Sequence, residues 1–105
     1  MSVTSIDLFP NTFEILTSET LPITIEWVDL IGNNAISTPS AVMIDQSNSI
    51  VIPEGFQNNY GANGTQSQYI FQGPFLQAGH KYIAIFSVMV GTQTFKARLF
   101  VNVPR

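Results

Sequence analysis

His80 is the only histidine in the chain, and cysteine is absent, so few side chains could carry covalent or metal chemistry. A hydrolase triad would have to be built around this imidazole, together with a carboxylate and a nucleophile. Its neighbours in the sequence are Gly79 and Lys81, and no acidic residue lies nearby. The sequence therefore predicts a solvated loop histidine, no catalytic residue and no enzyme.

The carboxylates are the other candidates for chemistry, as calcium ligands. Asp7, Asp29, Asp45 and Glu54 are scattered over separate segments. They do not have the alternating spacing with which a single loop supplies calcium ligands. We predict no metal and no cofactor, and a cation site assembled from several loops stays open as an alternative.

Composition limits the possible partners. Only 10% of the 105 residues are charged, 45% are hydrophobic and the net charge is −3. Nucleic-acid binding needs a cationic face that releases counterions. The longest apolar run, YIAIFSVMV, is far shorter than the roughly 20 residues of a membrane helix, and the N-terminus has no signal-peptide pattern. We expect neither nucleic acid nor membrane as a partner.

Alternation of period two is the main structural signal, and it predicts strands. Ile23, Ile25 and Trp27 share one face of an early strand, and two long strands over 81–90 and 93–103 alternate in the same way. Gly91, between the two long strands, favours a type II′ hairpin turn. The expected core includes Trp27, Phe86 and Leu99. The outward face of 81–90 is nearly as apolar as the inward one.

Shorter strands are expected at 3–9, 13–16, 41–45, 49–53 and 67–72, the first of them stopping at Pro10. About seven short strands separated by turn residues predict an all-β antiparallel sandwich with Greek-key connections. The length fits one domain over 1–105, with 1–20 as an N-terminal strand or arm and 21–103 as the sandwich core.

Leu76, Gly79 and Tyr82 form an L-x-x-G-x-x-Y pattern just before the first long strand. In Greek-key sandwiches, a tyrosine at this place returns its hydroxyl to the backbone of the preceding corner. We predict a structural corner here rather than a functional site.

The segments ITIEWVDLIG, AIS and GHKYIAIFSVMVGTQTFKARLFVNV resemble, over about 21–103, small immunoglobulin-like proteins encoded among bacteriophage structural genes. The chain also resembles sandwiches of the fibronectin type III kind. This resemblance implies a virion structural protein, with a capsid decoration or cement protein as the first expectation and a head–tail or tail component as the second. Its partners would be the major capsid protein or other virion proteins. It would form a homo-oligomer or be present in several copies, in particles assembled in the host cytoplasm.

Two stretches are the expected partner contacts, namely the segment before Pro10 and the loop 54–66. The residues named for this role are Phe9, Phe56, Asn58, Asn59 and Tyr60. Exposed aromatic rings among Asn and Gln also suit stacking on sugars. A carbohydrate-binding or host-adhesion module is therefore the rival hypothesis. The four cationic side chains are expected on a solvated outer sheet face.

Overall fold

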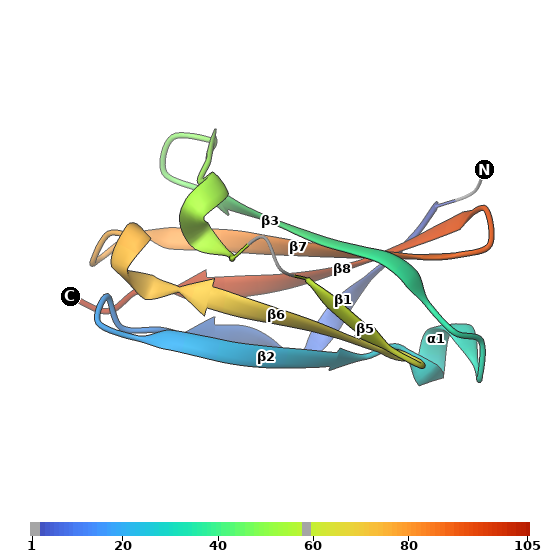
Figure 1. The fold of residues 1–105 in the computed structure, drawn as a ribbon. Coiled ribbons are helices and arrows are strands. Elements are labelled where there is room, and N and C mark those ends of the chain that lie inside the picture. The colour runs from blue at the N-terminus through green and yellow to red at the C-terminus, as the bar shows by residue number, and fades with distance from the viewer. Residues whose placement is uncertain (1–2, 58–59) are drawn as a thin grey trace.

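The computed structural model describes the backbone of residues 3–57 and 60–105, and the side chains of these residues from Phe13 onward. Within these ranges, eight strands form two sheets (Figure 1). The five-stranded sheet has the order β1 (Val3–Glu14), β8 (Gln93–Asn102), β7 (Lys81–Val90), β3 (Ser37–Asp45) and β4 (Ile50–Val51). The three-stranded sheet has the order β2 (Thr20–Glu26), β6 (Gln66–Gln72) and β5 (Gly61–Asn63).

The strand order is that of an immunoglobulin-like sandwich. Strands β2, β6 and β5 take the places of B, E and D, while β3, β7 and β8 take those of C, F and G, with β4 in the place of C′. The chain crosses directly from β1 to β2, and its three later crossings between the sheets contain the short helical turns α1 (Val28–Ile31), η1 (Pro53–Gly55) and η2 (Gly73–Phe75). The expected all-β Greek-key sandwich is confirmed, and no helix in the described ranges is both long and apolar enough to span a bilayer.

Strand β1 differs from the expectation of an antiparallel sandwich with separate pieces on either side of Pro10. It runs parallel to β8 as one strand, and the register shifts between Asp7 and Thr12. Such an irregularity leaves backbone groups outside the ladder, which is where a proline without an N–H is tolerated. The expected end of the first strand at Pro10 is therefore wrong, and with β5 the strand count is eight instead of about seven.

Alternation in the sequence accounts for the core, because every second residue of the long strands points between the sheets. In β7 and β8 the inward side chains are almost fully buried, whereas their neighbours are partly exposed. Trp27, Phe86 and Leu99 are 1%, 0% and 3% exposed. Around them lie the other large core residues Ile25, Met43, Phe71, Val88 and Val101.

The β7–β8 hairpin fixes the register of the two longest strands. Gly91 has φ +62°, and Thr92 is not among the residues with positive φ. This combination is the one expected of a type II′ turn, in which glycine occupies the first central position. The turn keeps ten consecutive residue pairs in register, from Val90 opposite Gln93 to Lys81 opposite Asn102.

Candidate functional site

The corner before β7 is built as a structural element. The backbone N–H of Gln77 donates to the Tyr82 hydroxyl at 2.8 Å. Gly79 has φ +83°, and its N–H donates to the Val103 carbonyl at 2.7 Å. Leu76 is buried beneath the turn. These contacts are those that the L-x-x-G-x-x-Y pattern predicts, and they hold the start of β7 against the end of β8.

His80 lies in the loop before β7, as the sequence suggested, but its side chain is only 31% exposed and has a partner. Its Nδ1 lies 2.8 Å from Oδ2 of Asp45, whose carboxylate is almost fully buried at the end of β3. The backbone N–H of Ser47 donates to Oδ1 of the same carboxylate at 2.9 Å. Burial acts to raise the pKa of Asp45, but the hydrogen bonds from His80 and Ser47 outweigh it and leave the pKa below its ordinary value.

The His80–Asp45 pair joins the end of β3 to the start of β7. Asp45 is opposite Tyr82 in the β3–β7 register, so the pair lies directly beside the corner. The described residues contain no group of three His, Cys, Asp or Glu side chains placed to hold a metal ion. Sequence reasoning missed this pair because its members are 35 positions apart in the chain.

The aromatic loop residues do not form the exposed patch that was expected. Phe56 is 3% exposed and its ring packs 4.8 Å from that of Phe71, so the prediction of an exposed recognition ring at this position is wrong. The Tyr60 hydroxyl donates to the Ala41 carbonyl at 3.1 Å. A ring beside the sandwich gains more by entering its core than by facing water. Asn58 and Asn59 lie outside the described residues, as does the side chain of Phe9.

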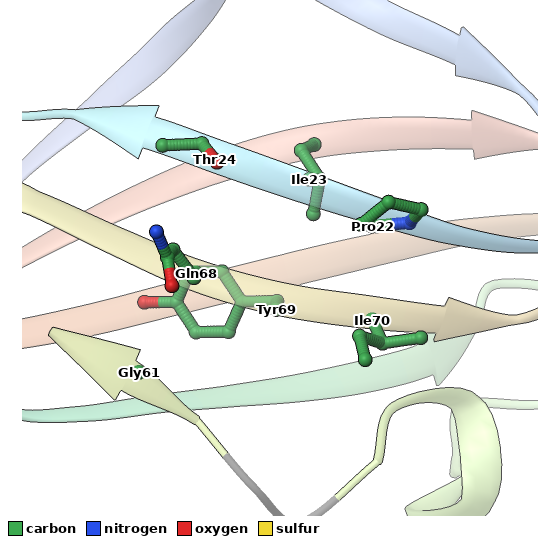
Figure 2. Close-up of a pocket in the computed structure, with 7 residues that line it drawn as sticks. All are labelled: Pro22, Ile23, Thr24, Gly61, Gln68, Tyr69 and Ile70. Atoms are coloured by element: carbon green, nitrogen blue, oxygen red, sulfur yellow. The ribbon is translucent and has the colours of Figure 1, made fainter.

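A shallow hollow lies on the outer face of the three-stranded sheet, with a volume of about 360 Å³ (Figure 2). Thr24 and Gln68 are paired across β2 and β6, as are Pro22 and Ile70. Gly61 of β5 lies opposite Gln68, whose side chain lies within 4 Å of the place that a Cβ on Gly61 would take. The remaining lining residues are Ile23 and Tyr69. The hollow therefore offers neutral hydrogen-bonding groups beside small apolar surfaces.

The outer face of the five-stranded sheet carries two rows of partly exposed apolar side chains. One row crosses four strands, since Val51 is opposite Ile44, Ile44 is opposite Ile83 and Ile83 is opposite Phe100. The next row sets Val42 beside Ile85 and Arg98. All seven side chains keep some exposure, and no described element packs on this face (Figure 1). These residues, except Arg98, are called here the apolar rows.

Cationic side chains flank the apolar rows. Three of the four Lys and Arg residues of the chain, Lys81, Lys96 and Arg98, alternate with the buried positions of β7 and β8 and so belong to this outer face. The Arg98 guanidinium carbon lies 5.9 Å from the centre of the Phe100 ring. The expectation that the cations lie on an outer sheet face holds for these three.

The comparisons with known proteins leave the family of this chain open. No protein-family model matches it, and no curated protein is significantly similar to it. The fold and the surface chemistry therefore provide the basis for a functional proposal.

Proposed function

We propose that this protein is a non-enzymatic structural protein of a bacteriophage particle, and that it attaches to the particle through the outer face of its five-stranded sheet. A capsid decoration or cement protein is the first candidate, with the major capsid protein as its partner. The observation that carries the proposal is the apolar rows, which lie uncovered on a rigid sheet. The sequence resemblance to small phage immunoglobulin-like proteins is the reason for proposing a phage particle as the binding partner.

Physical chemistry favours adhesion over catalysis at this face. Contiguous apolar side chains on a soluble domain usually mark a surface that another molecule covers. Here the rows contain Ile44, Ile83, Ile85 and Phe100, which are β-branched or aromatic and held by cross-strand neighbours, so little side-chain entropy is lost on docking. Val51, which lies on the edge strand β4, is 49% exposed. A rigid sheet with such rows suits a protein that stabilises a capsid shell by burying apolar surface against it.

The test is cosedimentation with phage particles stripped of this protein. The double variant Ile83→Ser, Phe100→Ser should lose binding, because it removes two adjacent apolar side chains of one row. Ile70→Ser is the matched control, since Ile70 is an outward, partly exposed residue of the other sheet. Circular dichroism should give the same fold for all variants. Unchanged binding of the double variant would contradict the proposal.

A head–tail or tail component would use the same face, and antibody labelling of particles in electron micrographs distinguishes the two locations. Label over the whole capsid shell would support decoration, whereas label at the vertex or tail would support the second candidate.

The hollow on the three-stranded sheet supports the rival function of a carbohydrate-binding module. Thr24 and Gln68 supply neutral hydrogen-bonding groups, and Pro22 and Ile70 supply small apolar surfaces of the kind that sugars contact. A glycan array tests it, with Gln68→Ala as the variant that should abolish any signal. A signal that survives in Gln68→Ala would argue against the hollow as its source.

A further inference from the structure

We propose that the partner of this outer face is an acidic protein surface, with an apolar centre that covers the apolar rows and carboxylates that meet Lys81 and Lys96. This inference rests on the proposed docking function and specifies the chemistry of the partner. Its basis is the placement of positive charge on a protein whose net charge is −3.

The two lysines lie at opposite ends of the apolar rows. Lys81 is opposite Asn102 in the β7–β8 register, and Lys96 lies six positions before Asn102 on β8. With a rise of about 3.4 Å per residue, the lysines are separated by roughly 20 Å along the strands. The rows of Ile83 and Ile85 lie between them. A complementary partner therefore has two carboxylates at about this separation, on either side of an apolar strip.

Arg98 lies opposite Ile85, beside the apolar rows, and is not assigned to a partner carboxylate. Its guanidinium is close to Phe100, and in the parallel pairing of β1 with β8 its residue is opposite Asp7. Lys81 and Lys96, at the two ends of the apolar rows, are the side chains that would each pair with a carboxylate of the partner. Lys81 is exposed and Lys96 is partly exposed.

Charge also favours a different protein over a second copy of this chain. A symmetric face-to-face dimer uses the same patch on both subunits. Such a dimer would place two lysine-bearing faces together. Few carboxylates are available there to pair with the lysines: among the described side chains, only that of Glu14, opposite Asn102 in the strand register, lies on this face. Like charges across an interface suppress pairing, whereas opposite charges steer encounter and fix orientation. A partner with acidic groups at its rim meets both conditions.

The first experiment uses a defined probe. A heptapeptide with Glu at both ends and alternating Thr and Leu between them places its carboxylates about 20 Å apart when extended. It is titrated into the isotopically labelled full chain, and backbone amide shifts are recorded by NMR. The matched peptide carries Lys at both ends. We expect shifts confined to β3, β7 and β8 with the Glu peptide, and much weaker shifts with the Lys peptide.

Matched variants separate local charge from net charge. Lys81→Gln with Lys96→Gln should weaken binding of the Glu peptide by about fivefold to tenfold, from two exposed ion pairs. Thr20→Glu with Asn63→Glu changes the net charge equally but at exposed positions of the other sheet, and should leave the affinity nearly unchanged. Raising NaCl from about 0.1 M to about 1 M shortens the screening length from about 10 Å to about 3 Å, and should weaken binding by the wild type but not by the lysine variant. Equal binding of both peptides, no binding, or shifts on β2 and β6 would overturn the inference.

Particle binding distinguishes this inference from the proposed function. If Ile83→Ser, Phe100→Ser abolishes cosedimentation but the lysine variant and salt have no effect, the docking function stands and the acidic partner is wrong. If the double serine variant still binds particles, the docking function itself fails. A dimer in analytical ultracentrifugation that Phe100→Ser dissociates would assign the face to a second copy, and would also overturn the inference.

Discussion

Asp45 and His80 form a hydrogen-bonded pair, with 2.8 Å between Oδ2 and Nδ1, in which a buried carboxylate at the end of β3 meets a partly exposed imidazole just before β7. Asp45 is 3% exposed, which is rare for a carboxylate unless its oxygens are paired. The second oxygen is satisfied by the Ser47 amide, so the whole group is a closed local network. The pair thus belongs to the architecture of the corner, together with Tyr82.

The first prediction is an acid-sensitive contribution of Asp45 to stability. Its pKa in the folded protein is lowered, so the unfolded chain binds the proton more readily. The contribution is complete above the unfolded pKa near 3.8 and is lost as pH falls through the still lower folded pKa. Asp45→Asn should reduce stability by about 1–3 kcal/mol at neutral pH and should lack this acid-dependent loss.

Urea unfolding of the wild type and of Asp45→Asn measures the effect. The titrations cover roughly pH 2 to 7, because this range extends to both sides of an ordinary aspartate pKa. Glu54→Gln changes the net charge by the same amount and is the control at neutral pH. Parallel stability curves for the wild type and Asp45→Asn at acid pH would contradict the assignment.

Local patterns in the sequence were sufficient for the corner and the long strands. Tyr82 is recognisable because its partner amide, that of Gln77, is five positions away and the geometry is encoded by an intervening Gly79. Inward and outward faces of β7 and β8 follow from alternation alone. The sandwich class then follows because several such strands must pack their apolar faces together.

The candidate site could not be predicted from the sequence, because it depends on which strands lie side by side in the fold. The pairing of His80 with Asp45 depends on β3 lying beside β7, which no local pattern encodes. The apolar rows require the cross-strand register of four strands, although the apolar outward positions of 81–90 were a visible signal. Phe56 was placed wrongly because its loop composition is polar, whereas the ring enters the core against Phe71 and Phe86.

The second prediction compares two buried tyrosines that should respond in opposite directions to loss of the hydroxyl. Tyr82→Phe removes the acceptor of the Gln77 amide and should lower stability by about 1 kcal/mol. The Tyr69 hydroxyl is buried without a hydrogen-bond partner among the described residues. Burial disfavours the charged phenolate and raises the pKa of Tyr69 to about 12.

Tyr69→Phe should therefore leave stability unchanged or raise it by up to about 1 kcal/mol, because a buried polar atom without a partner is removed. Each tyrosine variant is the control for the other in the same denaturant titration. A loss of stability in Tyr69→Phe as large as that in Tyr82→Phe would mean that the Tyr69 hydroxyl does have a partner.

The third prediction concerns the only tryptophan. Trp27 Nε1 donates to Ser67 Oγ at 2.8 Å, and both side chains are almost fully buried. Ser67→Ala would leave the indole N–H without an acceptor in the core, so stability should fall by about 1–3 kcal/mol. Ser87→Ala, on the outer face of β7, removes the same atom at a partly exposed position and should change stability little. Thermal melts that coincide for Ser67→Ala and Ser87→Ala would refute this prediction.

The last prediction tests the close backbone approach at η2. A Cβ on Gly73 would lie 2.2 Å from the Leu16 carbonyl oxygen and 2.6 Å from that of Glu19. The Gly73 amide also donates to the Glu19 carbonyl at 2.9 Å, so the turn before β2 cannot move away without losing this bond. Gly73→Ala should therefore destabilise the fold by about 2–3 kcal/mol, as overpacking against backbone does.

Gly91→Ala is the matched control for this effect, because nothing lies within 4 Å of its added Cβ and only the positive φ opposes the change. It should cost about 1–2 kcal/mol through backbone strain alone. Denaturant titrations rank the two variants. If Gly73→Ala were no more destabilising than Gly91→Ala, the turn between β1 and β2 would have to yield to the new methyl group, and its close packing on η2 would not be a fixed feature of the sandwich.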